Sequence, residues 1–154
     1  MVEVRRHTAQ VVIQRGLFLL LDANVEPNRQ ELPVPGELFR GTANWLAIAT
    51  GCEDGKAEVT LEQWDAEPLV VDRVKWEVVA DTVFLTGSGE VIPSSFVSNY
   101  LDEPFNLGVP GYYHLRICGR GRSEAMQIFS RPDSTLSDLD GVEQYRLQLW
   151  RRRE

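Results

Sequence analysis

The chain has 154 residues, of which 43% are hydrophobic, and a formal net charge of −7. This length and apolar content suffice for one domain with a sizeable core, and no run of about 18 apolar residues could span a membrane as a helix. The negative charge argues against direct binding of nucleic acid, because it repels phosphate groups. We therefore expect a single domain over residues 1–154, located in the cytoplasm and without a cleaved leader.

The N-terminal part of the chain predicts strands followed by a long loop. Two apolar runs, Val11–Ile13 and Leu17–Leu21, flank Arg15-Gly16, which indicates either one bent strand or two paired strands. Residues 24–41 contain three prolines, which cannot donate hydrogen bonds to a β-ladder. This segment is predicted to be a long proline-rich loop on the surface.

The clearest hairpin signal comes next. Trp45–Thr50 is predicted to be a strand, Asp54-Gly55 is a favoured turn dipeptide, and Lys56–Trp64 is the predicted partner strand. In the partner strand Val59 and Leu61 alternate with polar residues, among them two glutamates. One face of this strand should therefore lie in the core and the other should be acidic.

Further strands are predicted beyond this hairpin. Residues 72–79 alternate between apolar and polar side chains, Asp81 is expected to open a turn, and residues 83–86 extend again. Gly87-Ser88-Gly89 marks another tight reversal.

The C-terminal third has the best period of two. Tyr113, Leu115 and Ile117 fall on one face of a segment that follows Pro110-Gly111, and Tyr145–Trp150 repeats the pattern. Such alternation is typical of half-buried β-strands. We expect these two strands to fill the core together.

The connection between these two strands has no comparable period. Residues 124–129 could form a helical turn, and residues 131–142 are predicted to be a mobile loop because turn-forming and polar residues dominate. Residues 151–154 are predicted to be an arginine-rich tail.

These short strands, with turn signals about ten residues apart, favour an all-β fold. The prediction is a single-domain antiparallel β-sandwich of about eight short strands with one long proline-rich loop. An open barrel is the alternative.

Motifs for catalysis and for cofactors are missing from the sequence. Neither glycine-rich phosphate-binding fingerprint is present, and the two histidines and two cysteines form no local zinc motif. We predict no cofactor, no metal, two reduced structural cysteines and no enzymatic activity. A hydrolase that uses Cys118 and a histidine stays open as an alternative.

Acidic residues are concentrated in the middle of the chain. Residues 51–103 hold twelve acidic and three basic side chains. A field of this sign attracts basic partners and raises their association rate, although ordinary solubility could also explain it. The predicted acidic hairpin carries an aromatic side chain among its carboxylates, and such residues often anchor protein–protein contacts. The predicted partner-binding residues are Glu53, Asp54, Glu58, Glu62 and Trp64.

Two other interpretations stay open. Trp64 could pack beneath other parts of the protein while the glutamates are merely solvated. The protein could also be a small-molecule-binding β domain, with the 24–41 loop as a lid and Tyr112, Tyr113 and Trp150 lining a cavity.

The order of these features resembles a known family. An apolar N-terminal strand pair, a hairpin led by Trp45, the segment Phe105-Asn-Leu-x-x-Pro-Gly-Tyr-x-x-Leu115 and a terminal strand are similar to the bacterial competence-associated inhibitors of the DNA-entry nuclease. The resemblance covers about two thirds of the chain and transfers no inhibitory residue. It implies a β-sandwich that neutralises a nuclease or related toxin by protein–protein contact. The sequence thus predicts an acidic inhibitor or immunity-like protein with a basic protein partner.

Overall fold

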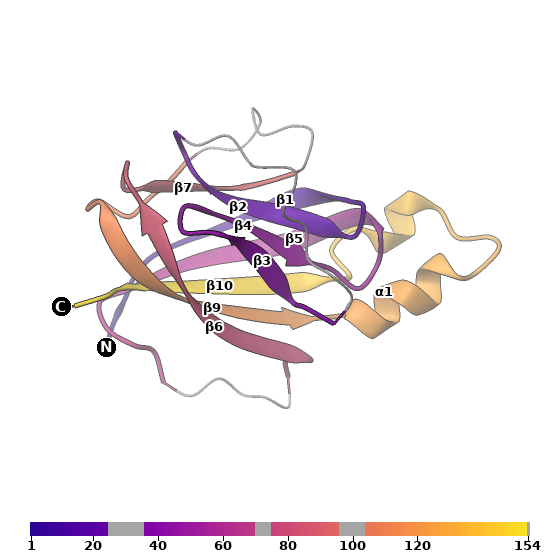
Figure 1. Ribbon diagram of the computed structural model, residues 1–154. Helices are drawn as coiled ribbons and strands as arrows, with labels where there is room; N and C mark the ends of the chain where they lie inside the picture. The colour runs from indigo at the N-terminus through magenta and orange to yellow at the C-terminus, as the bar shows by residue number, and fades with distance from the viewer. Residues whose placement is uncertain (25–35, 70–74, 96–103, 154) are drawn as a thin grey trace.

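The computed structural model describes residues 1–24, 36–69, 75–95 and 104–153, and strands dominate it (Figure 1). Besides the strands it contains one α-helix, α1 (Arg122–Phe129), and one short 3-10 helix, η1 (Leu136–Leu139). Neither is long enough to cross a membrane. The strands are β1 (Glu3–Gln14), β2 (Leu17–Asp22), β3 (Phe39–Thr42), β4 (Trp45–Ala49), β5 (Asp54–Trp64), β6 (Val78–Thr86), β7 (Glu90–Ser94), β8 (Phe105–Asn106), β9 (Gly111–Arg120) and β10 (Gln144–Arg151).

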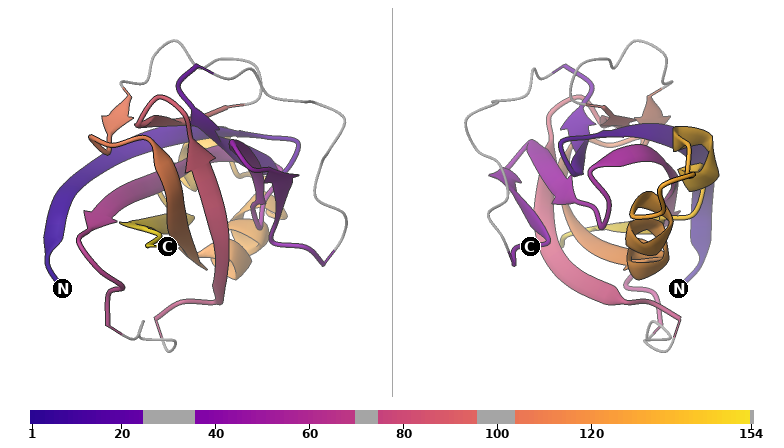
Figure 2. Two further views of the ribbon diagram at one scale, coloured as in Figure 1. Left: turned by 60° about the vertical axis from the view of Figure 1, so that its left-hand side comes forward. Right: turned by 90° about the vertical axis from the view of Figure 1, so that its right-hand side faces the viewer.

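The described strands belong to one hydrogen-bonded sheet in the order β3-β4-β2-β1-β5-β10-β9-β6, and β7 pairs with β2 and β8. The sheet curls into a half-barrel around its own core (Figure 2). This confirms the all-β class. It does not confirm a sandwich of about eight strands, because the pairing runs through one continuous ladder and the curl itself encloses the apolar face. The open-barrel alternative is closer to the observed sheet.

The predicted hairpin between β4 and β5 is wrong. β4 pairs with β2 and β3, whereas β5 pairs with β1 along its whole length and with β10 on its other side. The pairing of β5 with β10 is parallel, so the sheet is not purely antiparallel. The Asp54-Gly55 dipeptide therefore begins a strand and does not close a hairpin.

The predicted core of the C-terminal strands is confirmed. Leu147 lies opposite Ile117, and Leu149 lies opposite Leu115, in the antiparallel ladder of β10 and β9. All the apolar side chains that the alternation placed inside are buried: Tyr113, Leu115, Ile117, Tyr145, Leu147 and Leu149. β1, β2, β4 and β5 contribute further side chains to the same core, among them Val11, Phe18, Ile48 and Leu61.

β6 joins only the last two residues of the strand predicted over residues 72–79 to the strand predicted over residues 83–86. Residues 75–77 are not in a strand, and residues 72–74 lie outside the described residues. The expected turn at Asp81 is wrong, because Asp81 lies inside β6 opposite Arg116 of β9. The Asp81 carboxylate accepts a hydrogen bond from Arg116 Nε at 2.9 Å, so a residue typical of turns is tolerated within the strand. Residues 25–35 of the predicted proline-rich loop lie outside the described residues, and its final residues enter β3.

The two ends of the half-barrel differ. Both chain termini lie at one end, and α1 lies at the other (Figure 1). The connection from β9 to β10 contains α1 and η1, and the capping box between Thr135 and Asp138 orders the start of η1. The mobility of residues 131–142 stays a prediction.

Candidate functional site

The predicted contact residues on β5 share a face of the sheet. Val59 and Leu61 are fully buried in the core, so Glu58, Glu62 and Trp64 lie on the opposite, outer face, as the alternation predicted. The structure does not bring all five predicted residues together. Asp54 begins β5 and Trp64 ends it, so they lie about 33 Å apart along an extended strand.

Glu62 is enclosed and does not form an open contact surface. Its carboxylate pairs with Arg6 Nη2 and with Arg146 Nε, each at 3.0 Å. Trp64 Nε1 and Gln148 Nε2 donate hydrogen bonds to the same carboxylate at 2.9 and 3.1 Å. The side chain of Glu62 is only 1% exposed. Glu62 therefore holds neighbouring strands together, and the half-buried Trp64 indole is oriented by it.

The rest of this outer face is also occupied. Trp76, from the connection before β6, is buried, and the guanidinium groups of Arg120 and Arg146 lie 4.8 and 5.0 Å from its ring centroid. Farther along the sheet, His114 stacks on Trp150 at 5.3 Å between ring centroids. These contacts form a polar and aromatic layer that covers the sheet and stabilises it. Trp150 therefore lies on this face.

Cys118 lies in the same layer. Burial raises the pKa of its thiol to about 11, although Arg146 and Arg116 favour the thiolate. A thiol with this pKa is almost fully protonated at neutral pH and is a poor nucleophile. Cys52 is likewise free and buried. Across the described segments, no group of three or more His, Cys, Asp and Glu side chains could hold a metal ion.

Glu53 and Asp54 are exposed at the α1 end, directly after two residues whose backbone is fixed by a buried carboxylate. Glu143 accepts hydrogen bonds from the N–H groups of Gly51 and Cys52 at 2.7 and 2.9 Å. Tyr145 donates its hydroxyl to the same carboxylate at 2.6 Å, and burial raises the pKa of Tyr145, so the hydroxyl keeps its proton.

The β4–β5 connection packs closely against α1. A Cβ atom at Gly51 would lie 2.6 Å from the Cβ of Arg122, so only glycine permits this approach. Cys52 also packs with Ala125 of α1 and Leu139 of η1 in a small apolar cluster. The connection, α1 and η1 therefore form one supported structure, which we call the acidic end. Its exposed carboxylates are Glu53, Asp54, Glu124, Asp133, Asp138 and Asp140.

Sequence reasoning missed the exposed apolar side chains of the acidic end. Met126 and Phe129 of α1 are 57% and 39% exposed, and Leu136 of η1 is 59% exposed. Met126 and Phe129 are three residues apart and share one side of the helix. The sequence offered one signal for this surface, the length of the β9–β10 connection. Two to five residues suffice to join neighbouring antiparallel strands, and this connection is much longer.

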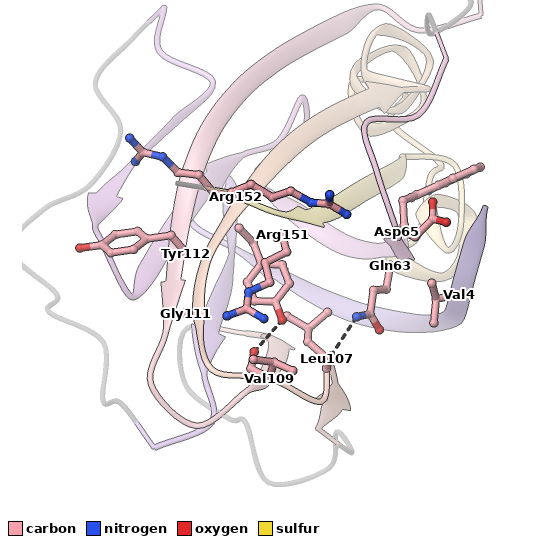
Figure 3. A pocket seen from close by; sticks show the side chains of 12 residues that line it. Val4, Gln63, Asp65, Leu107, Val109, Gly111, Tyr112, Arg151 and Arg152 are labelled. Atoms are coloured by element: carbon pink, nitrogen blue, oxygen red, sulfur yellow. Dashed lines mark hydrogen bonds between the residues drawn. The ribbon is translucent and has the colours of Figure 1, made fainter. Parts of the chain in front are cut away.

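A pocket of about 750 Å³ lies at the opposite end of the half-barrel (Figure 3). It is lined by Val4, Gln63, Trp64, Asp65, Leu107, Val109, Gly111, Tyr112, Tyr113 and Arg151–Arg153. Tyr113 donates its hydroxyl to the Val109 carbonyl at 2.6 Å, and Gln63 Nε2 donates to the Leu107 carbonyl at 2.9 Å. These hydrogen bonds fix two of its walls. Of the predicted cavity residues, Tyr112 and Tyr113 line the pocket and Trp150 does not.

Comparisons with known proteins identify a shared fold. No protein-family profile matches the chain, and no curated protein matches it by sequence. The crystal structure of ComJ from Bacillus subtilis, an inhibitor of the DNA-degrading activity of NucA, superposes with a TM-score of 0.63 at 15% identity and covers 97% of each chain. The protein of crocagin biosynthetic gene J gives a TM-score of 0.61 at 14% identity, over 97% of this chain and all of that one. The resemblance to the nuclease-inhibitor family is thus confirmed at the level of the fold.

Proposed function

We propose that this protein is a non-enzymatic inhibitor that neutralises a nuclease or related toxin by protein–protein contact. The observation that carries the proposal is the acidic end. Its exposed apolar side chains lie among carboxylates, and Glu143 holds the β4–β5 connection of this end in place. The likeness of the fold to ComJ, which inhibits NucA, supports the class of partner. It supports no individual contact residue, because the identity is only 15%.

The composition of the acidic end suits a basic protein partner. Met126, Phe129 and Leu136 can bury apolar area in a pocket of the partner, which is how most interface binding energy arises. The surrounding carboxylates would speed association with a basic surface and disfavour acidic proteins. The exposed cations nearby are fewer, Lys56 and Arg131 being two of them.

The contact surface that we propose differs from the one predicted from sequence. Glu53 and Asp54 stay at its rim, and the half-buried Glu58 lies on β5 beside it. Glu62 and Trp64 are omitted, because the Glu62 carboxylate is enclosed by four partners and Trp64 hydrogen-bonds to it.

Inhibition of DNA degradation tests this proposal. Purified protein is added to NucA and, separately, to an extract of the source organism, and cleavage of a fluorescent DNA duplex is followed. We expect the protein to suppress nuclease activity in at least one of these samples. The double variant Glu53→Lys/Asp54→Lys should associate more slowly and show a weaker dependence on ionic strength. Undiminished cleavage in both samples at about 10 μM protein would contradict the proposal.

A second candidate function, binding of a small molecule, is supported by the pocket at the opposite end. Its volume of about 750 Å³ lies within the usual range for ligand sites, and Tyr112 and Tyr113 line it as expected for this alternative. The lid expected over residues 24–41 falls largely outside the described residues.

A further inference from the structure

The three arginines at the end of β10 differ from four arginines elsewhere in the chain. Arg6, Arg40, Arg116 and Arg146 each pair with a carboxylate. In the described part of the chain no carboxylate lies within ion-pair distance of Arg151, Arg152 or Arg153, although the protein has a net charge of −7. These three consecutive arginines therefore keep their capacity to bind an anion.

All three arginines line the 750 Å³ pocket. Arg151 lies directly opposite Tyr113 in the β10–β9 ladder. The Arg152 N–H donates to the Tyr112 carbonyl at 2.9 Å, and its guanidinium lies 5.9 Å from the centroid of the Tyr112 ring. Strand pairing thus holds the backbone of Arg151 and Arg152 at the pocket.

The carboxylate in the pocket lining does not neutralise these arginines. Asp65 accepts a hydrogen bond from the Val2 N–H at 2.6 Å and lies 3.6 Å from the amino group of Met1. The overall negative charge of the protein also matters little here, because charges farther than about 10 Å apart are screened at physiological salt. The local field in the pocket is therefore positive.

The remaining walls of the pocket are mostly apolar. Val4, Leu107, Val109 and the ring of Tyr113 contribute hydrocarbon surface next to the guanidinium groups. Guanidinium groups bind phosphate and carboxylate through two parallel hydrogen bonds, and they also stack on flat rings. Apolar walls beside such groups suit a ligand with a charged part and an uncharged part.

We infer that this pocket binds an organic anion that carries at least two negative charges, as phosphate or carboxylate groups, beside an aromatic or apolar moiety. The charged groups bind Arg151, Arg152 and Arg153, and the uncharged moiety lies against Leu107, Val109 and Tyr113. This inference rests on the second candidate function and is independent of nuclease inhibition.

Isothermal titration calorimetry on the full chain tests the inference with three probes: ATP, benzene-1,3,5-tricarboxylate and adenosine. We expect one or both polyanions to bind and adenosine to bind far more weakly. The polyanion with the higher affinity shows whether the site prefers phosphate or carboxylate groups. The variant Arg151→Gln/Arg152→Gln should lower the affinity more than about tenfold. The matched control is Arg131→Gln, an exposed arginine at the other end that has no carboxylate partner among the described residues.

Three results would overturn the inference. Absence of binding for both polyanions at about 1 mM would remove the anion site and, if adenosine also fails to bind, the small-molecule function. Adenosine binding as tightly as ATP would leave a small-molecule pocket but refute its anion preference. An equal loss of affinity in Arg131→Gln would indicate attraction by net charge alone. Circular dichroism of each variant verifies that the sheet is retained.

Discussion

The carboxylate of Glu143 accepts a hydrogen bond from the backbone N–H of Cys52 at 2.9 Å, and this contact joins the start of β10 to the β4–β5 connection. Because α1 and η1 pack on the same connection, Glu143 holds the acidic end in one arrangement. We predict that Glu143→Gln lowers the free energy of unfolding by about 2 kcal/mol, since backbone donors lose a charged acceptor. Urea denaturation measures this loss, and Glu124→Gln on the exposed side of α1 is the control. Equal stability of the two variants would contradict the assigned role.

Glu62 should stabilise the polar and aromatic layer on the outer face of the sheet. Glu62→Gln would leave Arg6 and Arg146 without their shared carboxylate, but both cations are partly exposed and stay hydrated. We therefore expect a loss of about 2 kcal/mol, less than for a fully buried pair. The exposed carboxylate of Glu67 provides the comparison, because Glu67→Gln should change the unfolding free energy by less than about 0.5 kcal/mol. A Glu62→Gln variant as stable as Glu67→Gln would refute the network.

Asp22 should make the protein sensitive to acid. Burial tends to raise the pKa of its carboxyl, but hydrogen bonds from Thr86, Ser88 and the Asn24 N–H outweigh this effect and place it below the ordinary value. A depressed folded-state pKa contributes stability above the unfolded pKa of about 3.9, and this contribution is lost as pH falls through the folded value.

Asp22→Asn should therefore destabilise the protein at pH 7 and show a smaller further loss below about pH 4 than the wild type. Thermal unfolding at a series of pH values measures the difference. Parallel pH profiles for the two proteins would contradict the predicted pKa shift.

Both thiols should be unreactive in the folded protein. Cys52 and Cys118 are buried, and the pKa of Cys118 is raised to about 11, so little thiolate is present or accessible. With Ellman's reagent at pH 8 we expect slow release in native buffer and two equivalents in guanidinium chloride. Rapid reaction of one native thiol would reopen the hydrolase alternative.

Local alternation predicted the strands best where it was uninterrupted. The pattern of Tyr113, Leu115 and Ile117 identified both the strand and its buried face, because a period of two leaves only one arrangement with an apolar core. At Asp54-Gly55 the turn signal was misleading. The partners of β4 and β5 are set by β2 and β1, which lie far away in sequence, and Glu143 shapes the connection from near the other end of the chain.

The candidate site was harder to predict for the same reason. Alternation placed Glu62 on the correct face, but only the fold brings Arg6, 56 residues away, to its carboxylate. The exposure of Met126 and Phe129 depends on which side of α1 packs against Cys52 and Leu139. An eight-residue helix is too short for periodicity to decide that question.

Titration of nuclease activity with wild-type and variant protein tests the central claim most directly. The measured quantity is the concentration that halves DNA cleavage in whichever sample responds. We predict that Met126→Ala/Phe129→Ala raises this concentration by about 30-fold or more, because it removes the exposed apolar anchors of the acidic end. Leu69→Ala, an equally simple truncation of a side chain that is 75% exposed, should leave it unchanged. Equal potency of the wild type and the Met126/Phe129 double variant would contradict the claim that the acidic end binds the nuclease.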